Sequence, residues 1–324
     1  MSDLIREGAR LLAAGELVAF PTETVYGLGA DAANPAAVAK IFALKGRPSD
    51  HPLIVHVAGL EGLRAWSRDA PPEAFSLAQE FWPGPLTMIL KRSARVPDAV
   101  TGGQDTVGLR CPSHPMALEL LREFARVGSG AIAAPSANRF GHVSPTTADH
   151  VLDEFGADLF ILDGGACEVG LESTIVDLSR SAPVLLRPGA VTRGDIARVM
   201  GIEPRHRDDE APRAPGTLDA HYAPQTAMAL VSALSLDLEL RSLTNVAVLA
   251  LHEAPYSARV TTWIDAGSDP VRYGHDLYAN LRKLDASGAK RILVEAPART
   301  MAWEAVNDRL ERAAAGAGLV DDEP

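Results

Sequence analysis

The sequence predicts an α/β fold with a mixed sheet, followed by a second and smaller α/β domain. Short apolar stretches typical of buried strands alternate with amphipathic helical stretches along the chain. Aromatic residues are few, at 5%, and Ala, Leu, Val and Gly supply most of the apolar mass, as in layered α/β proteins. The length of 324 residues and the hydrophobic content of 47% allow a sizeable core and suggest two domains.

The first predicted elements are a helix, a strand and a second helix. Residues 3–14 place apolar side chains toward one side, and Gly15 ends this helix. "ELVAFP" predicts a short buried strand that Pro21 stops. A long loop, "PTETVYGLGADAANP", leads to the second helix, which Asn34 and Pro35 open as N-cap and first helical position.

The same alternation continues to about residue 200. Further strands are predicted at "PLIVHV", "LTMIL", "TVGLRC", "GAIAAP", "LFILD", "STIVDL" and "PVLLR". Further helices are predicted at "PPEAFSLAQEFW", "HPMALELLREFA", "TTADHVLDEF" and "RGDIARVM". We therefore assign residues 1–201 to the first domain.

The character of the chain changes at residues 202–224. This segment, "IEPRHRDDEAPRAPGTLDAHYAP", has four prolines and mixed charge in its first half, which predicts a linker. Residues 225–324 form the second predicted domain. Its strands are predicted at "TAMALV", "NVAVLAL", "VTTWI" and "RILVEA", and its helices at "DPVRYGHDLYANLRKLDA" and "WEAVNDRLERAAA".

Composition excludes several classes of protein. The formal net charge of -11 argues against binding nucleic acid through bulk electrostatics, although a local basic pocket remains compatible with it. Two cysteines, Cys111 and Cys167, provide neither a disulfide framework nor a four-ligand zinc site. The acidic, amphipathic start and the absence of a long apolar run lead us to expect a cytoplasmic protein.

Polar residues crowd the loop "FPTETVYGLGADA" where the first strand ends. Gly27 and Gly29 imitate a dinucleotide fingerprint, but Pro21 ends the strand six residues before Gly27, so an ordinary glycine-loosened loop explains them equally well. Thr24 lies at the strand end, the usual ligand position in open α/β sheets.

Four basic residues gather in "LKGRPSDHPLIVHV". Lys45 and Arg47 follow a helix end, where cations are favourable, yet this accounts for Lys45 alone. Arg and Lys beside a strand are also how proteins hold polyphosphate. His51 lies in the same loop, and His56 lies on the strand, where a hydrogen-bonded core histidine is the commoner reading.

Charged and hydroxyl groups mark three more strand ends. Thr106 and Arg110 fall four residues apart on one strand, so they share a face, and the buried Arg110 is expected to have a carboxylate partner from the protein or from a substrate. Ser173 begins one strand and Arg187 ends another.

The segment "APSANRFGHVSPTT" supplies neutral hydrogen-bonding groups. Ser136, Asn138 and Ser144 follow a strand of small residues, which would let a ligand approach the backbone. Each of them alone is also typical of an ordinary turn before a helix. The chain has no G-x-x-x-x-G-K-[ST] loop, no H-E-x-x-H and no G-x-S-x-G, and the spacing of His114 from Cys111 is a weak signal for a cysteine nucleophile.

Taken together, these segments resemble the threonylcarbamoyl-AMP synthase family with its YrdC-like domain. The motifs occur in the family's order from about Gly8 to Met200, and Lys45, Arg47, Ser136 and Asn138 match its K-x-R and S-x-N signature. "APGTLDAHYAP" and the second domain resemble the long members. The resemblance implies a twisted α/β sheet with a large cavity, and a small Rossmann-like second domain tied on by a linker that acts as a lid.

The resemblance also implies the reaction and its partners. The family joins L-threonine, bicarbonate or CO₂, and ATP into threonylcarbamoyl-AMP, releasing pyrophosphate, and Mg²⁺ is expected with the ATP phosphates, through protein ligands that the sequence does not identify. A partner transferase then passes the threonylcarbamoyl group to an adenosine of tRNA. No membrane association and no strong direct nucleic-acid binding are expected of this chain.

Site residues follow from the resemblance position by position. The implied L-threonine contacts are Thr24, His56, Arg110, Ala134 and Ser173. The implied ATP contacts are Arg47, His51, Thr106, Ser136, Asn138, Ser144, Arg187 and Tyr222. Lys45 and Arg47 are the implied catalytic residues. Two alternatives stay open at this point: an RNA-binding module that uses the same basic loops, and a carbamoyl-handling domain of related fold with another acceptor.

Overall fold

The computed structural model describes residues 2–255 and 259–318. The chain divides into two compact units, and each is described by itself. The first unit consists of Met1–Arg139, Pro145–Glu168 and Glu172–Thr217, and the second of Phe140–Ser144, Val169–Leu171 and Leu218–Pro324. Residues 202–217 of the predicted linker thus belong to the first unit.

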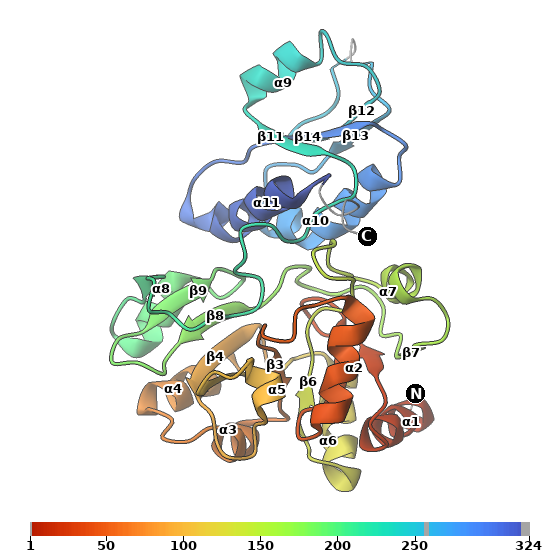
Figure 1. Cartoon of the computed structure of the whole chain (residues 1–324). Helices are drawn as coiled ribbons and strands as arrows, with labels where there is room; N and C mark the ends of the chain where they lie inside the picture. The colour runs from red at the N-terminus through yellow and green to blue at the C-terminus, as the bar shows by residue number, and fades with distance from the viewer. Residues whose placement is uncertain (1, 256–258, 319–324) are drawn as a thin grey trace. The chain divides into compact units, whose positions relative to one another are not determined.

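One mixed sheet organises the first unit (Figure 1). The strand order is β10-β9-β8-β4-β5-β3-β6-β2-β1-β7. The strands are β1 (Val18–Phe20), β2 (Gly27–Asp31), β3 (Ile54–His56), β4 (Leu86–Lys91), β5 (Thr106–Arg110), β6 (Ile132–Ala133), β7 (Phe160–Ile161), β8 (Thr174–Asp177), β9 (Val184–Arg187) and β10 (Arg205–His206). The sheet contains both parallel and antiparallel pairs, which confirms the predicted mixed α/β class.

Eight helices connect these strands in the described part of the first unit. They are α1 (Ser2–Ala13), α2 (Pro35–Lys45), α3 (Leu60–Trp66), α4 (Pro72–Phe81), α5 (Asp98–Thr101), α6 (Pro115–Val127), α7 (Ala148–Phe155) and α8 (Arg193–Met200). The predicted start of α2 is confirmed, because the Asn34 side chain accepts hydrogen bonds from the N–H groups of Ala36 and Ala37. Gly46, with φ of 64°, then ends this helix in the left-handed conformation.

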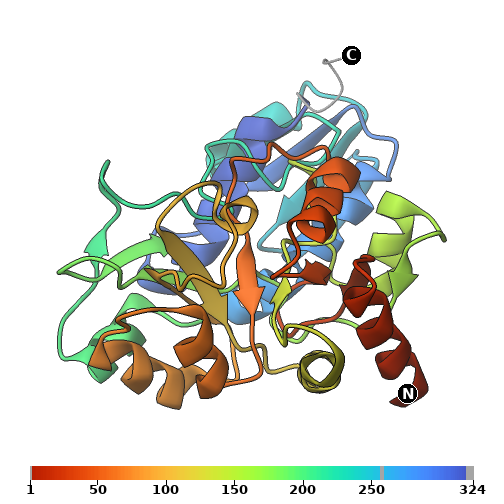
Figure 2. The same ribbon diagram turned by 60° about the horizontal axis from the view of Figure 1, so that its bottom comes forward.

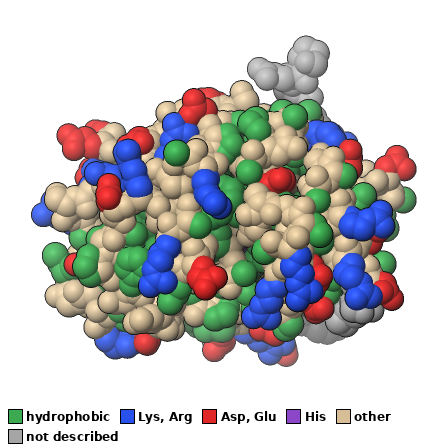
Figure 3. Space-filling model, turned by 90° about the horizontal axis from the view of Figure 1, so that it is seen from below, with side chains coloured by type: hydrophobic (Ala, Val, Ile, Leu, Met, Phe, Trp, Pro, Cys, Tyr) green, Lys and Arg blue, Asp and Glu red, His purple; other side chains and the backbone are tan. Residues whose placement is uncertain are grey.

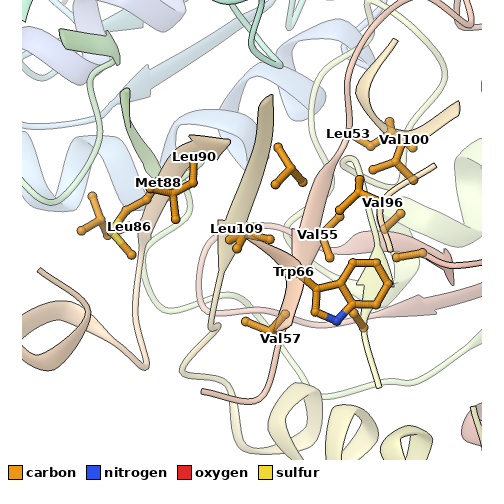
Figure 4. Packing of buried hydrophobic residues seen from close by; sticks show 14 of the residues in the cluster. Leu53, Val55, Val57, Trp66, Leu86, Met88, Leu90, Val96, Val100 and Leu109 are labelled. Atoms are coloured by element: carbon orange, nitrogen blue, oxygen red, sulfur yellow. The ribbon is translucent and has the colours of Figure 1, made fainter. Parts of the chain in front are cut away.

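The main core lies on one face of the sheet. Leu86, Met88 and Leu90 of β4 alternate with residues of the opposite face, and Leu109 of β5 packs beside them (Figure 4). The tryptophan of α3, Trp66, joins this cluster. Helices α3 and α4 lie on this side of the strands (Figure 2).

The opposite face is only partly covered by helices. Helices α1 and α6 pack on each other and on the end of the sheet formed by β1, β6 and β7, around Phe20 and Phe124. Toward the other end, a small apolar cluster joins Ile54, Ile175 and Leu186 to Ala214, which comes from the predicted linker. The strands between these two clusters carry polar side chains on this face.

One expectation about the first unit was wrong. The segment around Gly27 and Gly29 was expected to be loop, but Gly27–Asp31 forms strand β2 between β1 and β6. The two glycines make this possible, because a Cβ on Gly29 would lie 2.8 Å from both Ile132 and Phe20. Glycine is therefore needed here for close packing within the sheet.

The second unit contains a smaller, fully parallel sheet of order β11-β14-β12-β13. Its elements are β11 (Met228–Val231), α9 (Ala233–Glu239), β12 (Val246–Ala250), β13 (Thr262–Asp265), α10 (Pro270–Asp285), β14 (Arg291–Glu295), a 3₁₀ turn (Met301–Trp303) and α11 (Glu304–Gly316). Helices α10 and α11 lie on one side of this sheet and α9 on the other (Figure 1). The predicted strands are confirmed, whereas the short helix α9 was not predicted.

Two surface properties bear on the classes of partner. Among the residues that the structure describes, no helix is both long and apolar enough to cross a membrane. On the face of the molecule shown in Figure 3, basic and acidic side chains are interspersed and form no large patch of one sign. That face does not offer the basic surface that bulk nucleic-acid binding needs.

Replacing Leu109 by Ala is expected to lower the free energy of unfolding by about 2–5 kcal/mol, because Leu109 is fully buried in the main core and its truncation leaves a cavity. Chemical denaturation followed by circular dichroism measures this loss. The control is Leu4→Ala, whose side chain is 58% exposed and whose effect is expected to stay within about 0.5 kcal/mol. Equal losses in the two variants would contradict this account of the core.

Candidate functional site

Several of the predicted site residues lie on one face of the large sheet, in a band that crosses five strands. The register places His56 of β3 opposite Arg110 of β5, and Arg110 opposite Thr87 of β4. Ile175 of β8 lies opposite Thr87, and Arg187 of β9 lies opposite Ile175. Residues opposite each other on paired strands share a face of the sheet. We call His56, Arg110, Thr87 and Arg187 the polar row.

Apolar residues border the polar row. Ile132, opposite His56, belongs to the cluster beneath α1 and α6, and the Phe20 ring meets the His56 ring edge-on at 5.9 Å between centroids. Ile175 belongs to the small cluster that Ala214 completes. All four members of the polar row are buried. In such a water-poor setting, electrostatic interactions and hydrogen bonds are stronger than in water, and unpaired polar groups are costly.

Arg110 has the carboxylate partner that its burial requires. Its Nη2 donates to Glu23 Oε1 at 2.6 Å, and the two side chains are only 5% and 3% exposed. The second oxygen, Glu23 Oε2, accepts the backbone N–H of Ser113 at 3.0 Å. The Nε of Arg110 is buried without a hydrogen-bond partner among the described residues. The guanidinium therefore keeps donor capacity for a second carboxylate.

The loop that carries Glu23 is held by the hydroxyl of Thr22. Thr22 Oγ1 donates to the carbonyl of Val25 at 2.6 Å and accepts the backbone N–H groups of Thr24 and Val25 at 3.2 Å. Thr22 Oγ1 also lies 2.9 Å from Thr24 Oγ1, a contact in which either hydroxyl can be the donor. The hydroxyls of Thr22 and Thr24 are thus part of one hydrogen-bonded turn.

His56 is a neutral imidazole at physiological pH. Burial, and next the charge of Arg110, lower the pKa of His56 from 6.5 to about 3. Its Nδ1 is buried and has no hydrogen-bond partner among the residues described. An orphaned polar atom of this kind is costly unless a ligand pairs with it.

Ser173 links the far end of the polar row to its middle. Arg187 donates through Nε to the Ser173 carbonyl at 3.0 Å and through Nη2 to the Ser173 hydroxyl at 3.1 Å. The same hydroxyl is 2.7 Å from Thr87 Oγ1. The third nitrogen of Arg187, Nη1, donates to the carbonyl of Pro215 at 3.1 Å. Arg187 is thus fixed by a strand on one side and by the predicted linker on the other.

Lys45, at the end of α2, is buried and donates hydrogen bonds to backbone carbonyls. Its Nζ donates to the carbonyl of Ser136 at 2.7 Å and to the carbonyl of Asn138. Burial, and next the nearby charge of Arg47, lower the pKa of Lys45 well below its ordinary value. The K-x-R lysine and the S-x-N segment are therefore one connected structure.

The loop after Lys45 and the end of β6 hold the remaining predicted groups of the first unit. Arg47 Nη2 donates to the carbonyl of Pro52 at 3.0 Å. Burial and the charge of Arg47 lower the pKa of His51. Ser136 forms a β-bridge with Gly27, and Ala134 lies buried beside the same glycine, 3.3 Å from where its Cβ would be. Short side chains thus keep this backbone open to close approach.

Comparison with known proteins decides the family. The Sua5/YciO/YrdC profile, described as "Telomere recombination", matches residues 10–189, and the profile "Threonylcarbamoyl-AMP synthase, C-terminal domain" matches residues 191–315. The threonylcarbamoyl-AMP synthase of Pyrococcus abyssi is 39% identical over 95% of this chain and 93% of that protein. The threonylcarbamoyl-AMP synthase of Bacillus subtilis is 41% identical over 96% of this chain and 93% of that protein. The chain belongs to the threonylcarbamoyl-AMP synthase family.

A solved structure supports the same assignment for the fold. The crystal structure of P. abyssi Sua5 complexed with L-threonine matches with a TM-score of 0.87 and 39% identity, covering 96% of this chain and 94% of that one. The match therefore confirms the α/β fold class that the resemblance to this family implied.

Three further predicted ATP contacts are Thr106 of the first unit and Ser144 and Tyr222 of the second. Thr106 begins β5, partly exposed, and four strand residues place it about 13 Å from Arg110 along the same face. Ser144 and Tyr222 belong to the second unit. The Tyr222 ring packs there against His221 at 4.1 Å and beneath the Arg309 guanidinium at 5.4 Å.

Neither cysteine of the chain is poised as a nucleophile. Burial raises the pKa of Cys111 to about 11 and that of Cys167 to about 12, and the carboxylate of Glu23 adds to both shifts. The thiols stay protonated at neutral pH and are unreactive. Within the described residues, no group of three His, Cys, Asp or Glu side chains is arranged to hold a metal ion.

Sequence reasoning missed two residues of the site. Glu23 lies in the crowded loop "FPTETVYGLGADA" but received no role, although the expected carboxylate partner of Arg110 was a signal for it. Thr87 was missed altogether; its signal is a single polar residue within the apolar strand "LTMIL". Both residues contact predicted L-threonine ligands, Arg110 and Ser173 respectively.

Replacing His56 by Gln is expected to flatten the fall in stability as the pH drops. Because the folded pKa of about 3 lies below the unfolded value of 6.5, the unfolded chain binds a proton that the folded chain refuses between these values. This site therefore removes up to ~1.4 kcal/mol of stability per pH unit as the pH falls through that window. Denaturant unfolding at pH 7, 6 and 5 measures the slope. Parallel slopes for the two proteins would refute the neutral buried state.

Proposed function

We propose that this chain makes threonylcarbamoyl-AMP and pyrophosphate from L-threonine, bicarbonate or CO₂, and ATP, as an L-threonylcarbamoyladenylate synthase. The observation that supports this best is the likeness to threonylcarbamoyl-AMP synthases over nearly the whole chain, combined with a buried polar row that retains unused hydrogen-bonding groups. The product would serve a transferase that modifies tRNA, and we propose that both enzymes work in the cytoplasm.

The L-threonine subsite is proposed at one part of the polar row. Arg110 would receive the carboxylate through its unused N–H groups. Thr24 and neutral His56 would hold the amine, while Ser173 would meet the side-chain hydroxyl. Ala134 would leave room for the substrate. A site built to hydrogen-bond a hydroxyl rejects the isosteric valine far better than an apolar pocket does.

The ATP subsite is proposed at the basic loops. Arg47 and Arg187 would screen the triphosphate, and Lys45 would act both on the phosphates and on the backbone of Ser136 and Asn138 that it holds. The remaining proposed contacts are His51, Thr106, Ser144 and Tyr222. We propose that Mg²⁺ arrives with the ATP phosphates, because no carboxylate or imidazole cluster in the described residues is arranged for a resident ion.

The reaction needs positioning more than covalent help. The amine of threonine adds to CO₂ and loses a proton, which gives a carbamate. A carbamate oxygen then attacks the α-phosphorus of ATP and pyrophosphate departs. Because the resulting mixed anhydride hydrolyses readily, the site must exclude water, and residues 202–224 are proposed as the lid. Asp219 lies within this proposed lid, and a carboxylate is unfavourable beside a triphosphate, so we assign the phosphate contact there to Tyr222.

The direct test is release of pyrophosphate from ATP, bicarbonate and Mg²⁺ with and without L-threonine. Release that depends on threonine is the expected result, because the amino acid supplies the attacking group. Release that is unchanged by threonine, or stimulated equally by unrelated amino acids, would refute the proposed substrate. A salt-dependent complex with bare tRNA in the absence of turnover would instead favour the RNA-binding alternative.

Replacing Arg110 by Ala is expected to raise the KM for threonine far more than the KM for ATP, since Arg110 is proposed to meet the amino-acid carboxylate only. Steady-state pyrophosphate release, with each substrate varied in turn, measures both values. Arg198→Ala is the control, because the Arg198 side chain is 59% exposed on α8 and pairs with Glu80 at the surface. Equal rises in both KM values for the Arg110 variant would contradict the assigned role.

A further inference from the structure

Glu23 is a buried carboxylate that touches the polar row through Arg110. It lies next to Thr24 in the chain and is ion-paired with Arg110 in space. These two neighbours are proposed threonine contacts that come from different parts of the sheet: the loop between β1 and β2, and the end of β5. Glu23 therefore joins the two halves of the proposed amino-acid subsite.

We propose that Glu23 is a positioning residue for amino-acid recognition. Its carboxylate fixes the Arg110 guanidinium and the 22–24 loop relative to each other, so that the unused N–H groups of Arg110 meet the carboxylate of L-threonine. This inference rests on the proposed function, because it names threonine as the occupant of the subsite.

Both carboxylate oxygens of Glu23 accept a hydrogen bond. Oε1 accepts from Arg110 Nη2 at 2.6 Å, and Oε2 accepts from the Ser113 N–H at 3.0 Å, three residues after the arginine. The carboxylate thus binds the Arg110 side chain at the end of β5 and a backbone N–H of the segment that follows it. Because the Ser113 N–H holds Oε2, the plane of the carboxylate is fixed, and so is the direction from which Oε1 accepts the arginine.

Charge balance gives a second reason for a carboxylate at this position. A lone buried arginine would be an uncompensated charge, which is costly in a water-poor site. L-Threonine at neutral pH is a zwitterion with no net charge. With Glu23 present, the group formed by Arg110 and Glu23 is neutral before the substrate binds and stays neutral afterwards. The subsite can therefore bury the amino acid without creating a net charge.

Glutamine at position 23 cannot replace this function. It keeps the size of the side chain but has one acceptor oxygen, and its NH₂ group would face either the Arg110 N–H or the Ser113 N–H. One of the two donors then lacks a partner, and the arginine loses its fixed orientation. Glu23→Gln is therefore a specific test of the positioning role.

The experiment measures threonine binding by calorimetry and both KM values by pyrophosphate release. Glu23→Gln is expected to weaken threonine binding and raise its KM by about 10- to 100-fold, as for a buried donor left unpaired, with the KM for ATP changed less than about 3-fold. The matched control is Glu295→Gln in the second unit. Glu295 is also buried and also accepts a backbone N–H, that of Leu251 at 2.8 Å. This control is expected to leave the ratio of the two KM values unchanged.

A double variant separates positioning from a general structural role. If Glu23 acts through Arg110, adding Glu23→Gln to Arg110→Ala should weaken threonine binding by less than about 2-fold further. Independent, multiplying effects of the two substitutions would overturn the proposal, as would a threonine affinity in Glu23→Gln equal to that of the wild type. Should Glu23→Gln fail to fold, Glu23→Asp tests the same point, since it keeps the charge but shortens the reach; undiminished threonine affinity there would also contradict positioning.

The outcomes also separate this inference from the proposed function. Wild-type protein that binds threonine and releases pyrophosphate, together with an unimpaired Glu23→Gln variant, refutes the positioning role alone. Wild-type protein that neither binds threonine nor shows threonine-dependent release refutes both.

Discussion

Compensation of buried charge is the constraint on which the candidate site depends. Arg110, Arg187 and Lys45 lie on or beside a sheet face from which water is largely excluded. Each is satisfied differently: Arg110 by the carboxylate of Glu23, Arg187 by a hydroxyl and carbonyls, and Lys45 by two backbone carbonyls. Of the printed contacts, only that of Arg110 is with a carboxylate; those of Arg187 and Lys45 are with neutral oxygens.

Close packing within the sheet sets the course of the backbone around the site. Strand β2 fits between β1 and β6 because Gly29 lacks a Cβ that would collide with Phe20 and Ile132. The end of β6 is then fixed from the other direction by Lys45, whose ammonium holds the carbonyls of Ser136 and Asn138. The sequence signature K-x-R and S-x-N thus has a structural basis in this chain, because its two parts are in direct contact.

Sequence reasoning reached the class of fold and most of the elements because their signals are local. Asn34, Pro35 and Gly46 bound one helix through backbone chemistry that can be read from neighbouring residues. The strand at Gly27–Asp31 could not be predicted in this way, because its glycines are required by the close approach of side chains on other strands. The same distinction applies to the site: a partner for Arg110 was predictable, but its identity as Glu23 depends on a contact across 87 positions of sequence.

Thr87 is a second site residue that could not be predicted from local sequence. A threonine within an apolar strand has many explanations, and only the register of β4 between β5 and β8 places it beside Ser173. Tyr222 was named from likeness alone, because nothing in its local sequence marks it as a ligand.

The register also sets an order of events during synthesis. The polar row is contributed by β3, β4, β5 and β9, and its last member, Arg187, is translated long after the first three strands have emerged. A nascent chain that ends before β9 has Ser173 and Thr87 but not the arginine that donates to the Ser173 hydroxyl. Contacts this distant along the chain form slowly. The polar row is therefore complete only after β9 has emerged, and a newborn polypeptide that lacks β9 also lacks this donor to Ser173.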